Sequence, residues 1–191
     1  MSMSADGFVA DANGGNDWIF KTGDSESQAW SVALGASAGL IIMGRKSFEM
    51  MAPYWPTASG PFAEPMNRIP KAVFSKSGYK GTDPENKIDP EQSPAAASWA
   101  SARIFDGDLA TTINQLKAEP GDAPIVALGG ATFMRNLIAA GLIDEFHLAI
   151  HPVILGSGMP IFTGVTSPMY LKLAEVKTFP NGTCVHSYYP A

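Results

Sequence analysis

The sequence is poor in the residues that build disulfides and metal sites, and it lacks membrane-spanning runs. It holds one cysteine, Cys184, and three histidines among 191 residues. A single cysteine cannot form an internal disulfide and suits a reducing compartment. No apolar run approaches the roughly 20 residues that span a bilayer. No basic segment followed by an apolar one marks a secretory signal. We therefore expect a cytoplasmic protein that does not use a membrane.

Several motifs that carry chemistry are also missing. The chain has no Gly-x-Gly-x-x-Gly, no Walker A sequence and no His-Glu-x-x-His. No serine, cysteine or threonine lies in a recognisable nucleophile motif. His147 and His151 share one face of a predicted strand. Two histidines without further ligands are more typical of structural positions than of a metal site. No metal is expected.

Charge and length limit the remaining classes. The net charge of −5 argues against a nucleic-acid partner, which normally requires a basic face. Any polyanionic cofactor must then find local positive charge, and Arg45, Lys46, Lys71 and Lys76 are the candidates. With 46% hydrophobic residues the chain can bury one sizeable core. We expect a single domain over residues 1–191 with an inserted loop at 78–101, where the chain is polar and contains proline.

The order of predicted elements indicates an α/β fold. Strands alternate with helices in the first three quarters of the chain, which predicts a parallel sheet. The expected strands are 1–4, 8–10, 40–43, 72–75, 102–105, 125–128, 144–151, 171–178 and 183–189, and the expected helices are 26–36, 46–51, 109–117 and 132–140. The last three strands have little helix between them and should pair antiparallel, so we expect one mixed sheet.

Local signals refine these boundaries. Ser25 and Gln28 suit a capping box, and Asp108 suits an N-cap. Asn181-Gly182 predicts a type I′ hairpin turn between the last two strands. Residues 53–70 contain five prolines and read as irregular, either a lid over a site or a plain surface loop.

Three predicted strand ends offer groups that could bind an anion. The strand at 124–128 runs into Gly129-Gly130 and then a helix, so a ligand could approach the backbone and the free N–H groups of the helix. The strand at 40–43 runs into Gly44, followed by two cations and a hydroxyl. The strand at 72–75 ends in Ser75-Lys76-Ser77. Each alone could be a structural turn or a solvated basic turn. Together they favour a dinucleotide across the carboxyl ends of a sheet.

These segments resemble one known family. The similarity lies in Met43–Glu49, Ser75–Ser77, Leu128–Phe133, Ser4–Ala10 and His151–Phe162. They resemble the dihydrofolate reductase-like fold, and more closely its branch with the reductase domain of bacterial riboflavin-biosynthesis deaminase/reductases and their stand-alone relatives. The zinc signature of the deaminase half is absent. The resemblance implies a three-layer α/β fold with a mixed, mostly parallel central sheet, helices on both faces and a C-terminal antiparallel hairpin.

The resemblance also implies an activity and a cofactor. It implies a reductase that transfers hydride from NADPH to a small heterocycle, either a pyrimidine as in 5-amino-6-(5-phosphoribosylamino)uracil reductase or a pterin as in dihydrofolate reductase. It implies a cis peptide bond between Gly129 and Gly130, and a homodimer to which the segment 152–162 contributes. The cofactor-binding residues that it implies are Val9, Ala10, Gly44, Arg45, Lys46, Ser47, Ser75, Lys76, Ser77, Gly129, Gly130, Ala131, Thr132 and Phe133.

The substrate side of the site is less specified. Asp6 follows the first strand and is the candidate catalytic carboxyl, with a plain Asp-Gly turn as the alternative. Trp18, Phe48 and Met51 could enclose a flat heterocycle, although each could equally be core. Glu26 is a weaker candidate for binding the substrate. Two alternatives stay open on the same fold: a non-catalytic NADP(H)-binding sensor, and a structural domain.

Overall fold

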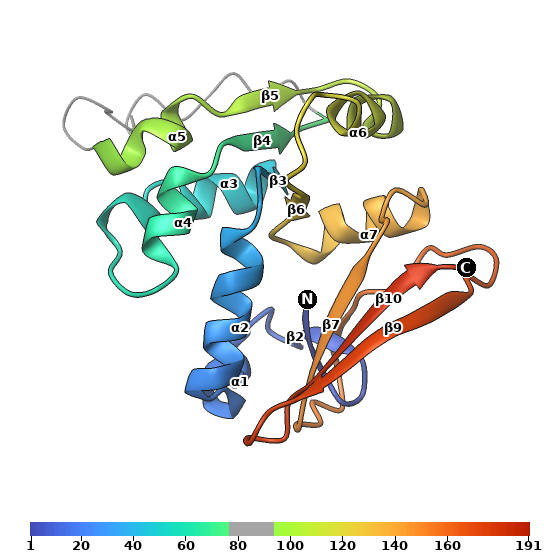
Figure 1. Ribbon diagram of the computed structural model, residues 1–191. Coiled ribbons are helices and arrows are strands. Elements are labelled where there is room, and N and C mark those ends of the chain that lie inside the picture. The colour runs from blue at the N-terminus through green and yellow to red at the C-terminus, as the bar shows by residue number, and fades with distance from the viewer. Residues whose placement is uncertain (77–93) are drawn as a thin grey trace. The chain divides into compact units, whose positions relative to one another are not determined.

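The computed structural model describes residues 1–76 and 94–191, and its chain divides into two compact units (Figure 1). Unit 1 comprises Met1–Trp30 and Met134–Ala191, and unit 2 comprises Ser31–Phe133. The chain combines a parallel sheet, helices and a largely antiparallel sheet, so the α/β class predicted from the sequence is confirmed. Among the described residues, no helix is both long and apolar enough to cross a bilayer.

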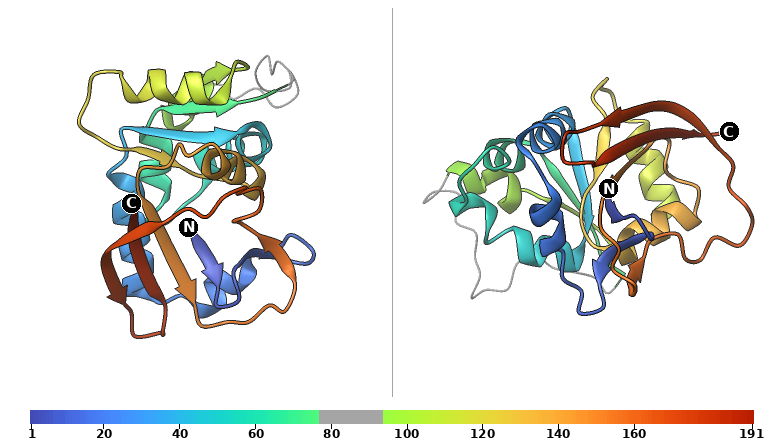
Figure 2. Two further views of the ribbon diagram at one scale, coloured as in Figure 1. Left: turned by 90° about the vertical axis from the view of Figure 1, so that its right-hand side faces the viewer. Right: turned by 90° about the horizontal axis from the view of Figure 1, so that it is seen from below.

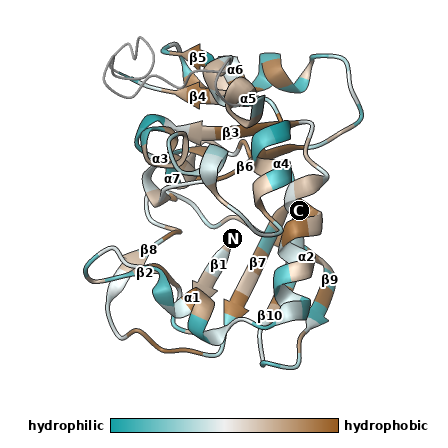
Figure 3. Ribbon diagram, turned by 90° about the vertical axis from the view of Figure 1, so that its left-hand side faces the viewer, coloured by the Kyte–Doolittle hydropathy of each residue, from teal (hydrophilic) through white to brown (hydrophobic). Residues whose placement is uncertain are grey.

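Unit 2 is built on a four-stranded parallel sheet with the order β5-β4-β3-β6. Its strands are β3 (Leu40–Gly44), β4 (Lys71–Phe74), β5 (Arg103–Phe105) and β6 (Ile125–Ala127). The inner strand β3 pairs with β4 and β6, so both of its edges are hydrogen-bonded. Ile41, Ile42 and Met43 are all buried, so both faces of the strand are covered, as expected for an apolar run in a parallel sheet. Figure 3 shows the hydrophobic colour along β3 and β4.

The helices of unit 2 lie partly where the sequence predicted none. They are α3 (Arg45–Met51), η1 (Trp55–Thr57), α4 (Ala63–Arg68), η3 (Pro94–Ala96), α5 (Ala97–Ala100) and α6 (Leu109–Lys117). The expectation of irregular chain at 53–70 is wrong at residues 55–57 and 63–68, which are helical, because Pro56 and Pro65 lie in the first turns of η1 and α4, where a missing N–H costs nothing. Residues 94–100 of the expected inserted loop are helical, and residues 77–93 lie outside the described residues. The predicted Asp108 cap is confirmed, since its carboxylate accepts the Thr111 N–H at 2.9 Å.

The core of unit 2 joins the sheet to these helices. Its buried members lie in β3, β4, α3, α4 and α5 or close beside them in the chain, which explains why the short helices form despite their prolines. They are Ala38, Ile41, Met43, Phe48, Ala52, Met66, Ile69, Val73 and Trp99.

Unit 1 contains two further ladders. The strands β1 (Ser2–Ser4), β7 (Phe146–His151), β10 (Cys184–Pro190) and β9 (Leu171–Thr178) form one sheet in the order β1-β7-β10-β9, parallel only between β1 and β7. The strands β2 (Phe8–Asp11) and β8 (Gly158–Pro160) form an antiparallel pair. The described strands therefore form three hydrogen-bonded sheets rather than the single mixed sheet expected, because apolar patterns do not specify which strands pair.

The hairpin between β9 and β10 is confirmed (Figure 2), but its turn is not of the predicted type. A type I′ turn needs positive φ at both Asn181 and Gly182. Gly182 has a φ of +86°, but Asn181 does not have a positive φ, since all the described residues with a positive φ are glycines. The Gly182 N–H instead donates to the Phe179 carbonyl at 2.9 Å. Pro180, with its φ fixed near −65°, favours the first central position of a type I turn.

Three helices complete the chain: α1 (Asp17–Thr22), which the sequence did not predict, α2 (Ser25–Ala36) and α7 (Ala131–Ala139). The capping box predicted at Ser25 and Gln28 is wrong by one residue, because Asp24 and Ser27 form it instead. Asp24 Oδ1 accepts the Ser27 N–H at 2.7 Å, and Ser27 Oγ accepts the Asp24 N–H at 3.1 Å. Asp24 fits this role because a carboxylate is a stronger acceptor than the Ser25 hydroxyl.

Two histidines on one face of β7 should make unit 1 sensitive to acid. His151 Nδ1 lies 2.9 Å from Thr22 Oγ1, and His147 Nδ1 lies 2.9 Å from Ser187 Oγ. Burial lowers the pKa of both imidazoles. As the pH falls below about 6.5, the unfolded chain therefore binds more protons than the folded chain does. The stability that the two neutral histidines contribute above that pH is then progressively lost.

We expect the free energy of unfolding, measured by urea titration, to fall between pH 7.5 and 5.5. A His147→Gln/His151→Gln double variant should show a flatter profile over the same range. An equally steep profile in the double variant would assign the acid sensitivity to other groups.

Candidate functional site

Two strand-to-helix junctions meet within unit 2. The Gly130 N–H, at the junction of β6 and α7, donates to Ser47 Oγ, in the first turn of α3, at 2.7 Å. Next to it, a Cβ on Gly44 would lie 3.2 Å from the Cβ of Phe133. Parallel strands end at one edge of a sheet, so two segments far apart in sequence form one surface. The structure thus brings together five of the predicted cofactor residues: Gly44, Ser47, Gly129, Gly130 and Phe133.

The double glycine adopts a different backbone from the one expected. No peptide bond among the described residues is cis, so the expected cis bond between Gly129 and Gly130 is wrong. Gly129 turns the chain with a φ of +115°, a conformation that favours glycine. A Cβ there would lie 2.6 Å from Ser47 Oγ, whereas a Cβ on Gly130 would meet nothing closer than 3.4 Å. Gly129 is thus required by the fold, while Gly130 is exposed and open to a ligand.

Two cations occupy the first turn of α3. Arg45 Nε lies 3.6 Å from Glu49 Oε1, one turn further along the helix, and Lys46 is exposed. Positive charge near a helix N-terminus is unfavourable, and an anion bound at that end would offset it. The charges therefore suit a phosphate, although Glu49 already balances part of the charge on Arg45.

The end of β4 contributes an unpaired hydroxyl. Ser75 is 7% exposed, and its Oγ has no hydrogen-bond partner among the described residues. Its backbone N–H donates to the Phe105 carbonyl at 2.9 Å, which fixes the residue beside β5. Buried polar atoms are normally paired, so this oxygen suits a bound ligand or water. The exposed Lys76 follows it, and Ser77 lies outside the described residues.

The first turn of α7 contains the remaining predicted cofactor residues. Thr132 is exposed, whereas Ala131 is buried. Phe133 packs on Phe74, with ring centroids 5.3 Å apart, and is 8% exposed. In this structure the Phe133 ring therefore belongs to the packing beneath the turn.

In unit 1, Asp6 is held as a hydrogen-bond acceptor. Its carboxylate accepts Ser4 Oγ–H at 2.6 Å, the Gly156 N–H at 2.7 Å and the Leu155 N–H at 3.2 Å. The Ser4 hydroxyl, followed by the two backbone amides, lowers the pKa of Asp6. An ionised carboxylate cannot donate a proton, so a catalytic role for Asp6 would have to be electrostatic or positional. Its contacts explain how the Asp6-Gly7 turn is tied to the segment after β7.

The other predicted residues of unit 1 have mixed surroundings. Val9 and Ala10 lie in β2, where Ala10 is buried and pairs with Met159 of β8. Trp18 of α1 is 7% exposed and meets His151 edge to face, with centroids 5.5 Å apart. Glu26 is exposed in the first turn of α2. A role for these residues toward cofactor or substrate stays a prediction.

The predicted substrate residues of unit 2 lie in its core. Phe48 is 2% exposed and packs on Trp99, with centroids 5.8 Å apart. Met51 is half-buried against the same core. Their contacts support the alternative that the sequence left open, in which both side chains stabilise the fold.

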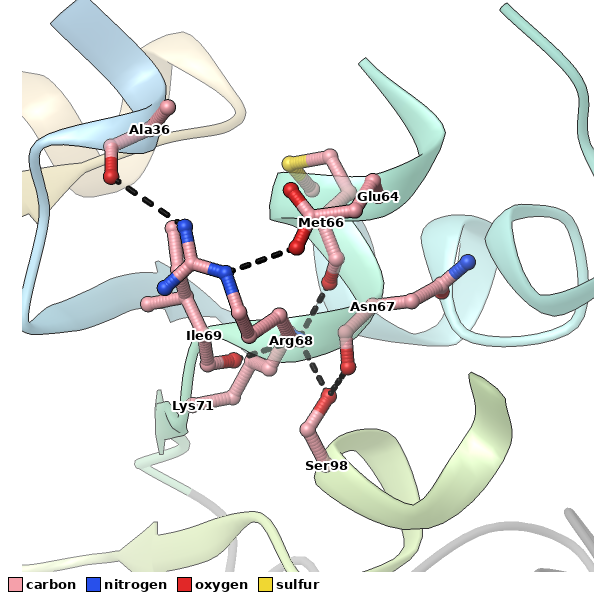
Figure 4. A network of polar contacts seen from close by, with 8 residues as sticks. All are labelled: Ala36, Glu64, Met66, Asn67, Arg68, Ile69, Lys71 and Ser98. Carbon is pink, nitrogen blue, oxygen red and sulfur yellow. Dashed lines mark hydrogen bonds and ion pairs between the residues drawn. The ribbon is translucent and has the colours of Figure 1, made fainter. Parts of the chain in front are cut away.

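The largest departure from the sequence analysis is Lys71. The sequence suggested a cation available to a cofactor, but the side chain is 1% exposed. Its Nζ donates to the Met66 and Ile69 carbonyls and lies 2.6 Å from Ser98 Oγ (Figure 4). The signal available in the sequence was its position at the start of an apolar strand, which favours burial over exposure.

Comparison with known proteins agrees with this architecture. The chain matches the RibD C-terminal domain family over residues 1–185. It is 32% identical over 182 residues to the uncharacterized protein YyaP of Bacillus subtilis, across 95% of this chain and 88% of that protein. It is 26% identical over 189 residues to YwjB of the same organism, across 97% and 93% of the two chains.

Solved structures share the fold at lower identity. A putative riboflavin biosynthesis protein from Shewanella sp. PV-4 aligns with a TM-score of 0.74 at 21% identity, over 100% of this chain and 96% of that one. A pyrimidine reductase-like protein from Corynebacterium diphtheriae gives 0.69 at 17% identity, over 100% and 89%. RibD of Acinetobacter baumannii gives 0.69 at 17% identity, and the match covers 56% of that longer chain.

The family match, the fold and the predicted motifs agree, so the resemblance inferred from the sequence is confirmed. The family is that of a reductase domain of riboflavin biosynthesis, which supports a reductase-like role for the chain. The chain belongs to the RibD C-terminal domain family.

Proposed function

We propose that this protein is an NADPH-dependent reductase that transfers hydride to a small heterocycle of the pyrimidine or pterin class. The observation that carries the proposal is the hydrogen bond from the Gly130 N–H to Ser47 Oγ. It unites two glycine-bearing junctions at the carboxyl edge of the parallel sheet, which is where open α/β sheets bind nucleotides.

The residues of unit 2 fit a dinucleotide phosphate. The pyrophosphate would pass over the exposed Gly130 and bind the backbone N–H groups at the start of α7. Lys46, the Ser47 hydroxyl, Lys76 and the unpaired Ser75 hydroxyl would bind the adenosine half with its 2′-phosphate. When bound, NADPH would supply the hydride. The protein would orient the nicotinamide and exclude water from it.

A titration with NADPH and NADH tests the proposal. The 2′-phosphate adds about −1.5 to −2 charges, and a charge-assisted contact contributes about 1.5–3 kcal/mol. We therefore expect NADPH to bind roughly tenfold to a hundredfold more tightly than NADH. A Lys46→Ala/Lys76→Ala variant should lose that preference, whereas Lys117→Ala, at the end of α6, should keep it. Equal affinities in the unmodified protein would contradict the proposal, and NADPH binding without turnover of any pyrimidine or pterin would favour a sensor.

Asp6 gives a second test, located in unit 1. Asp6→Asn places an amide N–H against backbone N–H donors, so the midpoint of thermal unfolding should fall while NADPH affinity stays unchanged. If the carboxylate also stabilises the substrate electrostatically, turnover at a temperature where the variant is folded should fall by roughly 10²-fold. Turnover close to that of the unmodified protein would limit Asp6 to structure. Asp17→Asn, in the exposed first turn of α1, is the matched control.

We also propose that the protein is a homodimer. The edge strand β9 and its surroundings expose large apolar side chains, including Leu173 (52%), Val176 (49%) and Tyr170 (77%). Exposed apolar groups on an edge strand favour pairing with another chain. Sedimentation equilibrium should give twice the mass of 20.2 kDa, and a Leu173→Lys/Val176→Lys variant should sediment as the monomer. A monomeric unmodified protein would contradict the proposal.

A further inference from the structure

The buried amine of Lys71, at the start of β4, makes hydrogen bonds to α4, to the residue that follows α4 and to α5 (Figure 4). Lys71 Nζ contacts two backbone carbonyls, those of Met66 and Ile69, and one hydroxyl, that of Ser98. The Trp99 ring centroid lies 4.3 Å from Nζ. Ser98 Oγ is also within hydrogen-bond distance, 2.5 Å, of the Asn67 carbonyl.

No carboxylate among the described contacts balances this amine. On α4, Glu64 pairs with Arg68 at 2.8 Å, and neither η3 nor α5 contains a charged residue. On the neighbouring strand β5, Arg103 pairs with Glu119 at 2.5 Å. Burial therefore acts on Lys71 without an opposing negative charge, and it lowers the pKa of the amine to about 7. Both its charged and its neutral forms are populated near neutral pH.

The three partners of Lys71 determine how its neutral form must bond. A neutral amine offers two N–H donors and one lone pair. Carbonyl oxygens only accept, whereas a serine hydroxyl can donate. The two N–H groups must then serve the Met66 and Ile69 carbonyls, and the lone pair must accept the Ser98 proton. When Lys71 is charged, the Ser98 hydroxyl donates to the Asn67 carbonyl instead.

We propose that Ser98 is a nucleophile for which Lys71 is the general base, and that it accepts small activated acyl groups. A serine hydroxyl becomes nucleophilic when an adjacent base can take its proton, and paired serine and lysine residues serve this purpose in some hydrolases. Ser98 is half-buried and lines a hollow that is open among the described residues, so a small electrophile can reach it. The hollow is further lined by Asn67, Arg68, Pro70, Ala97 and Ser101. This site is independent of the proposed reductase activity.

The reaction with an aryl ester illustrates the step. Ser98 Oγ attacks the ester carbonyl carbon while its proton passes to Lys71 Nζ. The bond between that carbon and the phenolic oxygen then breaks, and the phenolate leaves with the electron pair. The products are an ester on Ser98, a charged Lys71 and a phenolate, so no oxidant or other reactant is needed.

Acetylation by p-nitrophenyl acetate tests the proposal on the full chain. We expect a burst of nitrophenolate close to one equivalent, with the acetyl group on Ser98 by peptide mass spectrometry. Ser98→Ala should lose the burst. Ser101→Ala should keep it, because Ser101 lines the same hollow but its hydroxyl donates to the Ala97 carbonyl at 2.8 Å. The burst rate should rise with pH and level off above about 8, once Lys71 is neutral.

Lys71→Arg separates base catalysis from packing, because arginine keeps the charge but cannot give up its proton. We expect it to slow acetylation of Ser98 by roughly 10²-fold. If this variant does not fold, the pH profile and the two serine variants decide. Acetylation of Ser98 no faster than that of Ser101, or an acetyl group found only on lysines, would overturn the proposal.

Discussion

Replacing Gly130 with alanine should leave the protein folded and weaken NADPH binding by at least about 10²-fold, equivalent to roughly 2.7 kcal/mol. The new methyl group would lie 3.4 Å from Ser47 Oγ, a contact that a small shift relieves. It would, however, occupy the exposed surface over which the proposed pyrophosphate approaches the backbone. Calorimetric titration with NADPH, together with thermal unfolding, measures the two effects separately.

Replacing Gly129 with alanine should destabilise the protein instead. Its φ of +115° costs an alanine about 1–3 kcal/mol, and the added Cβ would lie 2.6 Å from Ser47 Oγ and 2.7 Å from Ser47 Cβ. Gly60→Ala is the matched control, since Gly60 has a φ of +103° with nothing within 4 Å of its Cβ position. We expect Gly129→Ala to lower the free energy of unfolding by about 3 kcal/mol or more, well beyond the control. Similar losses in both variants would show that the positive φ alone causes the destabilisation, and would contradict a steric clash between the new Cβ and Ser47.

Replacing Lys71 with methionine should be among the most destabilising substitutions in unit 2. Methionine fills much of the same space but leaves the Met66 and Ile69 carbonyls without the donor that now pairs them. An unpaired buried acceptor costs about 1–3 kcal/mol, so we expect a loss of roughly 2–5 kcal/mol. Urea denaturation measures it, and Lys76→Met, an exposed lysine just beyond the end of the same strand, is the control.

The loss caused by Lys71→Met should also depend on pH. The pKa of Lys71 is about 7 in the folded chain and about 10.4 when unfolded. Between these values the unfolded chain binds more protons, so the unmodified protein gains stability from Lys71 as the pH rises through this window. The difference between the two proteins should therefore be larger at pH 9 than at pH 6.5. A difference that stays constant or shrinks would contradict the lowered pKa.

Some positions could not be assigned from the sequence because opposite roles leave the same pattern. Phe48 and Met51 are apolar residues three positions apart in a predicted helix, where a substrate wall and a core look alike, and only their contacts with the core of unit 2 distinguish the two. Lys71 looked available because lysine is rarely buried. Its burial depends on carbonyls of α4 and a hydroxyl of α5, and neither helix was predicted. Ser98 lies in no nucleophile motif, so only its distance from Lys71 singles it out.

The sequence by itself determined the α/β class, the family, the apolar strands and the glycine junctions, because these depend on local patterns of apolar residues, glycines and caps. Tertiary structure alone decided how the strands are divided among three sheets, the backbone of the Gly129-Gly130 turn and the surroundings of Asp6, Lys71 and Ser98. The physical reason is that burial and hydrogen bonding are set by partners distant in sequence. Gly130 and Ser47, for example, are separated by 83 positions, and no local pattern encodes that contact.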